Sequence, residues 1–190
     1  MKTLVLTVAV FIVLVSCTST QTITETQQKE LMTWGAEKPF EIVSNSAIPM
    51  QTVAFNAVAN SGILAPGSSA GTIDLTTNAN YFRMQGDTIS AHLPYYGERR
   101  FGSNYGNNQT GIIFDGVPKT KDIVWNAKKQ RLEMRFSIKQ TRDNELYNIF
   151  VIIYPNNRTQ ININSSERTT ISYNGTIKPL QETPKTEGDI

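Results

Sequence analysis

A period-two alternation of apolar and polar residues is the feature that most constrains the fold of this chain. It is clearest between residues 131 and 139, where the apolar positions are Leu132, Met134, Phe136 and Ile138. Because successive side chains of a strand point to opposite faces of a sheet, this pattern predicts a strand with one buried face and one wet face.

Similar patterns between turn signals predict further strands along most of the chain. They fall at residues 41–46, 72–76, 82–84, 89–93, 111–115, 122–126, 160–164 and 170–177. Residues 145–154 are apolar on both faces and predict a central, well-covered strand. Gly86-Asp87 predicts a two-residue hairpin. About eight short antiparallel strands predict an all-β fold, either a β-sandwich or a partly open barrel.

The predicted β domain covers residues 39–177. Residues 17–38 are rich in Thr, Gln, Glu and Lys and predict a polar tether, in which residues 27–34 could form a short helix. Residues 52–60 fit a short helix and a strand equally well. Residues 178–190 carry prolines and charges and predict a disordered tail.

The first sixteen residues have the organisation of an export signal. Lys2 provides a positive charge, and residues 4–15 form a twelve-residue apolar stretch, far short of the roughly 20 residues of a membrane-spanning helix. Leu14-Val15-Ser16-Cys17 resembles the lipobox of bacterial lipoproteins, which implies cleavage before Cys17 and lipid attachment to its thiol. Cys17 is the only cysteine in the chain, so it has no disulfide partner there.

The expected location is therefore the bacterial cell envelope, with the N-terminal lipid in a membrane. Thr18-Ser19-Thr20 lacks the acidic run that resembles a surface-export signal in such bacteria. This favours the outer membrane, with the protein facing the periplasm.

Composition argues against several classes of partner and chemistry. The 18 basic and 16 acidic residues give a net charge of +2, and the basic residues are scattered, so we expect no nucleic-acid partner. His92 is the only histidine, and alternation points it outward, away from partners for a catalytic triad or a metal site. We expect no catalytic residue, metal or cofactor.

Several short motifs together resemble one known group of proteins. They are Asp87-Thr88-Ile89, Leu93-Pro94-Tyr95-Tyr96-Gly97, Gly111-Ile112-Ile113-Phe114 and Ile171-Ser172-Tyr173-Asn174-Gly175. With them the chain resembles lipoproteins of the domain of unknown function 4251 family, found mainly in Bacteroidetes, over most of residues 40–177. The resemblance implies an exported all-β domain and brings no catalytic residues. The first motif also resembles an O-glycosylation acceptor of that phylum, which makes Thr88 a candidate modification site.

One segment combines aromatic rings, guanidinium groups and glycines. Its candidate ligand-binding residues are Tyr95, Tyr96, Arg99, Arg100 and Tyr105. The other interpretation, which we favour, is that the tyrosines end a strand and pack on the rim of the core.

Three functions remain open from the sequence. The first is a noncatalytic, membrane-anchored envelope lipoprotein that binds a ligand or an envelope protein or glycan through loops. The second is a structural or assembly component of the envelope, which should display an exposed apolar patch or an open sheet edge. The third is a glycan-acting hydrolase, which needs two facing carboxylates.

Overall fold

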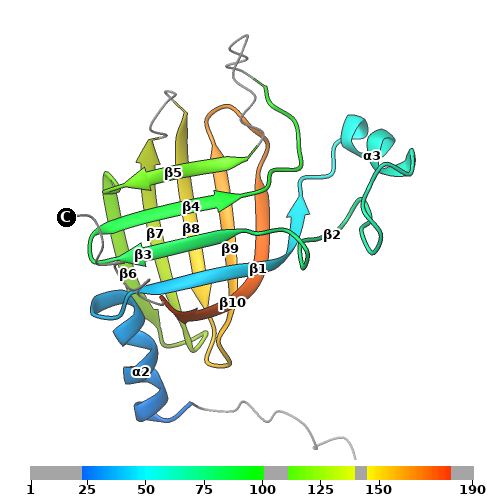
Figure 1. The fold of residues 1–190 in the computed structure, drawn as a ribbon. Helices are drawn as coiled ribbons and strands as arrows, with labels where there is room; N and C mark the ends of the chain where they lie inside the picture. The colour runs from blue at the N-terminus through cyan, green and yellow to red at the C-terminus, as the bar shows by residue number, and fades with distance from the viewer. Residues whose placement is uncertain (1–22, 101–110, 140–144, 181–190) are drawn as a thin grey trace, which may run out of the picture.

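Ten strands and two short helices make up the computed structural model, which describes residues 23–100, 111–139 and 145–180 (Figure 1). The strands are β1 (Phe40–Pro49), β2 (Ile73–Asp74), β3 (Tyr81–Gln85), β4 (Thr88–Leu93), β5 (Ile112–Gly116), β6 (Thr120–Asn126), β7 (Arg131–Lys139), β8 (Leu146–Ile153), β9 (Arg158–Ser165) and β10 (Ile171–Pro179). The helices are α2 (Glu25–Ala36) and α3 (Val53–Asn60). The predicted all-β class and strand positions are confirmed.

All the strands belong to one antiparallel sheet with the order β5-β4-β3-β1-β10-β9-β8-β7-β6, and β2 pairs with β1. The sheet curls so that β1, β3, β4 and β5 cross in front of β7, β8 and β9 (Figure 1). β5 and β6 are the two ends of the strand order. Of the two predicted architectures, the partly open barrel is confirmed, and the β-sandwich is wrong because a single continuous sheet forms both layers.

The junction of the two halves is the pairing of β1 with β10, from Phe40 opposite Pro179 to Pro49 opposite Ile171. The register shifts between Ser44 and Ser46, so Asn45 is an extra residue that forms a β-bulge. Opposite Ser44 lies Gly175, where an added Cβ would stand 2.2 Å from the carbonyl oxygen of Val43. Only glycine allows the two backbones to approach this closely.

Aromatic side chains fill the space between the front and rear layers. Phe82 on β3 contacts Phe136 on β7, with ring centroids 6.0 Å apart. Phe114 on β5 contacts Tyr147 on β8, with centroids 5.8 Å apart. The interior of the half-barrel is therefore a packed core that holds the curl together by apolar burial.

The alternation predicted for β7 is confirmed, since its four apolar side chains are all buried. β8 differs in part from its predicted burial on both faces. Its inward side chains and Ile152 are buried, but Phe150 is half-buried and Asn148 is exposed. The Arg135 guanidinium covers the Phe150 ring at 4.7 Å, so a charged side chain supplies the cover on this face.

The possible helix within residues 27–34 exists as α2 and packs on the domain. Thr24 and Gln27 form a capping box at its start. Leu31 is buried, and the ring of Trp34 contacts Phe40 edge-on at 6.3 Å. Part of the predicted tether is thus helical and packed against the sheet, near the start of β1 (Figure 1). Within residues 23–100, 111–139 and 145–180, neither helix is long and apolar enough to cross a membrane.

Residues 52–60, which fitted a helix or a strand, form α3. The Thr52 side chain caps the helix by accepting a hydrogen bond from the Phe55 backbone N–H at 3.1 Å. Phe55 is buried, but the helix as a whole stands away from the sheet beyond the end of β1 (Figure 1).

Candidate functional site

The loop that carries most of the predicted ligand-binding residues closes one end of the half-barrel. We call residues 94–100 the rim loop and residues 166–170, which join β9 to β10, the return loop. The Arg100 N–H donates to the Glu167 carbonyl at 2.6 Å, and the Thr169 N–H donates to the Glu98 carbonyl at 3.0 Å. The two loops are therefore joined by backbone hydrogen bonds.

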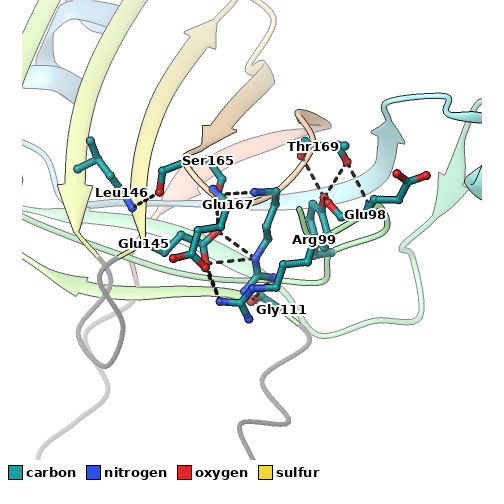
Figure 2. A network of polar contacts seen from close by, with 11 residues as sticks. Glu98, Arg99, Gly111, Glu145, Leu146, Ser165, Glu167 and Thr169 are labelled. Carbon is teal, nitrogen blue, oxygen red and sulfur yellow. Dashed lines mark hydrogen bonds and ion pairs between the residues drawn. The ribbon is translucent and has the colours of Figure 1, made fainter. Parts of the chain in front are cut away.

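A buried ion pair lies beneath these loops. The Glu145 side chain is completely buried and the Arg168 side chain is 3% exposed, with Nε and Oε1 3.0 Å apart. The Ser165 hydroxyl donates to the Glu145 carboxylate, and Arg168 Nη1 donates to the Gly111 carbonyl at 3.1 Å. Figure 2 shows how β8, β9 and the start of β5 converge here. Buried charges are costly unless they are paired, so separating this pair is unfavourable. The pair therefore keeps the adjoining ends of the three strands together.

Arg99 adds a second cation, and we call Arg99, Glu145, Glu167 and Arg168 the end latch. Arg99 Nη2 is 2.7 Å from Glu167 Oε2 and 3.8 Å from Glu145 Oε2 (Figure 2). The latch combines two guanidinium groups with two carboxylates, so its formal charges cancel. Both carboxylates contact arginines, which suits them to fixing the rim loop in place.

Tyr95 is part of the same arrangement. Its hydroxyl donates to the Glu98 carbonyl at 3.0 Å and also bonds the Thr169 hydroxyl at 2.8 Å. The Arg168 guanidinium lies 5.1 Å from the centre of the Tyr95 ring. Tyr95 thus caps the core and links the rim loop to the return loop, as the favoured interpretation of this segment expected.

Tyr96 and Arg100, two more of the predicted ligand-binding residues, differ in their exposure. Tyr96 is half-buried against the core, and its hydroxyl accepts from Asn78 Nδ2 at 3.2 Å. Arg100 is exposed. Tyr105 lies outside the described residues, as does Cys17. A ligand role for these tyrosines and arginines stays a prediction.

Two further buried tyrosines line the latch end of the core. Burial raises the pKa of both Tyr147 and Tyr173 well above the usual value for a phenol, although the nearby Arg168 charge acts in the opposite direction. The Tyr173 hydroxyl donates to the Pro94 carbonyl at 2.8 Å, at the base of the rim loop. Both phenols therefore act as neutral groups that stabilise this end.

The candidate modification site lies beside a confirmed turn. Gly86-Asp87 connects β3 to β4 as predicted, with Gly86 at a φ of +60°. Thr88 is the first residue of β4 and is half-buried. Its glycosylation stays a prediction. His92 is exposed on the same strand, as the alternation predicts, with its ring 6.3 Å from that of Tyr81.

A groove that was not predicted from the sequence lies on the outer face of the sheet, at the end of β9 opposite to the latch. It measures about 570 Å³ and is lined by ten residues from β1, β9, β10 and the turn before β9. We call it the outer groove; its lining includes Asn45, Tyr154, Arg158, Gln160 and Asn174. The sequence signal for this groove was the alternation of amides with isoleucines in residues 160–164. That alternation by itself predicts only a strand with one wet face.

The structure therefore defines a curled antiparallel β domain with a packed interior, a buried ion-pair latch at one end and a polar groove outside. The chain belongs to the family described as a domain of unknown function, DUF4251, whose sequence profile matches residues 23–177. The expected family is confirmed, and the match includes α2. Comparison with curated proteins and with solved structures found no significant match.

The latch can be tested by removing one charge of the buried pair. Arg168→Met should lower the free energy of unfolding by about 3–5 kcal/mol, because Glu145 is left buried without its main partner. Urea denaturation measures the loss. Asp87→Asn, which removes the exposed ion pair with Lys121, is the control and should change little. A similarly small effect of both substitutions would show that the latch does not stabilise the fold.

The buried tyrosines predict a loss of stability in alkali. Their folded pKa values lie above that of an unfolded tyrosine, which is about 10, so the stability they confer is complete below about pH 10 and declines as pH rises beyond it. Tyr173→Phe removes one of these groups. The free energy of unfolding is measured by urea titration between pH 8 and 11.5. Above pH 10 it should fall less steeply for the variant than for the wild type, and the two slopes should differ by about 1.4 kcal/mol per pH unit. Equal slopes would contradict this explanation.

Proposed function

We propose that this protein is an exported, noncatalytic envelope lipoprotein that binds a protein partner through an apolar projection of residues 48–63. The projection comprises the end of β1, α3 and the turn after it. It holds five of the eight exposed large apolar side chains of the described residues: Ile48, Met50, Val53, Val58 and Ile63. Val53 is 89% exposed and Ile63 is 77% exposed. This concentration of exposed apolar surface is the observation that carries the proposal.

Charge is also missing from this part of the chain. No Asp, Glu, Lys or Arg occurs between Glu41 and Asp74. The centre of a protein–protein interface is depleted in charged residues in the same way. An uncharged, partly helical projection suits a partner with an apolar pocket or groove.

A lipid surface is the less favoured occupant of the projection. Helices that lie in the membrane interface carry Lys and Arg on their polar face and Trp among their apolar residues. The projection has none of these, and Phe55, its one aromatic residue, is buried in the domain. The Thr52 hydroxyl, at the start of α3, also hydrogen-bonds the Glu98 carboxylate of the rim loop. This bond supports a fixed orientation of the projection for docking.

The proposed anchor would tether the domain to a membrane from the α2 side, whereas the projection lies beyond the other end of β1 (Figure 1). Seven residues lie between Cys17 and Glu25, the first residue of α2, and the eight residue-to-residue steps from Cys17 to Glu25 span at most about 29 Å. We propose that the membrane is the outer membrane on its periplasmic side, and that the partner is an envelope protein within reach of the tethered domain.

The anchor is tested by Cys17→Ser. The variant should lose the acyl mass in mass spectrometry and leave the membrane fraction, because each buried methylene of the lipid contributes about 0.8 kcal/mol to membrane binding. Acylation of the variant at another residue, or an unmodified wild-type protein, would overturn the lipobox interpretation.

The projection is tested by placing a photo-crosslinking amino acid at position 53 or at position 124 and irradiating the host cells. Val124 is the control because it is an exposed apolar residue on β6, outside the projection. We expect a protein adduct of defined mass from position 53 only, and its loss when Ile63→Asp is added. An adduct of twice the chain mass would favour the alternative, a structural component that assembles with itself. Lipid adducts alone would overturn a protein partner.

A further inference from the structure

From its chemistry, we infer that the outer groove binds an uncharged saccharide. This site is separate from the projection, none of whose exposed side chains lines the groove. The polar lining side chains are mainly amides and hydroxyls, among them Asn45, Gln160, Asn174 and Thr176. Each can donate and accept a hydrogen bond, which matches the hydroxyl groups of a sugar ring.

The charges around the groove narrow the class of ligand. Among the described residues no carboxylate lines it, so they offer nothing to pair with a cation, and Arg158 is the one charged residue of this lining. Nucleic acids require a row of basic groups. An extended peptide binds best at a sheet edge with free backbone groups. Here the strands that form the groove, β1, β10 and β9, are paired with one another in the interior of the sheet.

Cross-strand pairs on β9 and β10 show where a ligand would find free partners. Away from the groove, Asn164 accepts a hydrogen bond from Thr170 at 2.6 Å, and Asn162 accepts one from Ser172 at 2.7 Å. The next pair in the same row is Gln160 with Asn174, and both line the groove. Their side chains make no hydrogen bond with any other residue of the described part of the chain. The amide groups of this pair are therefore available to a ligand.

Tyr154 supplies an aromatic surface at the same place. It is half-buried, and the Arg131 guanidinium lies 6.0 Å from its ring centre. A sugar presents apolar C–H groups beside its hydroxyls, so an aromatic ring next to amides can contact both. The backbone ladder of three strands holds these groups in place before a ligand arrives.

The bulge in β1 explains why the groove forms at this point. The extra residue Asn45 is exposed and lies next to Ser46, which pairs with Asn174. Gly175, whose lack of a side chain lets β1 lie close to β10, also lines the groove. The groove volume, about 570 Å³, is within the usual range of about 300–1,000 Å³ for small-ligand sites.

The test uses the purified mature protein against printed panels of neutral oligosaccharides (gluco-, manno-, galacto- and N-acetylglucosamine series), acidic oligosaccharides and extended peptides. Binding is then quantified by isothermal titration calorimetry. We expect at least one neutral series to bind, and Tyr154→Ala and Asn174→Asp each to weaken that binding about tenfold or more. Asn148→Ala, an exposed amide on β8 outside the groove, is the matched control and should bind normally.

Three results would overturn the inference: no neutral series binds, only acidic glycans or peptides bind, or neutral glycans bind equally to the groove variants. Circular dichroism and the thermal midpoint report whether each variant is folded. Should Tyr154→Ala fail to fold, Asn174→Asp with Gln160→Ala decides the outcome, because both of these side chains lie on the surface of the sheet. Ile63→Asp should leave saccharide binding unchanged, so the groove and the projection succeed or fail separately.

Discussion

The pairing of β1 with β10 is the interaction on which the rest of the structure depends. It joins the first and last strands of the domain, so that the hairpins of β3 to β5 and the meander of β6 to β9 become one sheet. The close approach at Gly175 and the bulge at Asn45 accompany the curl at this junction. Because the sheet curls, Phe82 and Phe114 reach Phe136 and Tyr147 on the opposite layer, and apolar burial holds the two halves together.

Local patterns in the sequence were sufficient to predict the strands but not their arrangement. The alternation in β7 and the hairpin at Gly86-Asp87 depend on residues that are neighbours in the chain, and both were predicted correctly. Whether the strands form a sandwich or one curled sheet depends on the pairing of residues 40–49 with residues 171–179, which no local period reveals. The short α2 was recognised only as possible, although Thr24 and Gln27 carry the spacing of a capping box.

The candidate sites differ in how much of them the sequence could predict. Tyr95 was correctly expected to cap the core, because an aromatic residue at a strand end usually packs inward. The ion pair of Glu145 with Arg168 was not foreseen, because both residues lie in short connections where charges are common. The outer groove combines Asn45 with Asn174, which are more than a hundred residues apart in the chain. Side chains that meet only through β1–β10 pairing cannot be grouped without the fold.

The packed interior and the latch together explain why binding surfaces should be sought on the outside of this domain. Side chains fill the concave face, and the loops at one end are tied by buried charges, so a ligand entering there would have to break the latch. Breaking a buried pair costs several kcal/mol, more than many weak ligands supply. The groove and the projection require no such opening. Strands paired on both sides form the groove, and the apolar side chains of the projection already face solvent, so neither surface has to disturb the core.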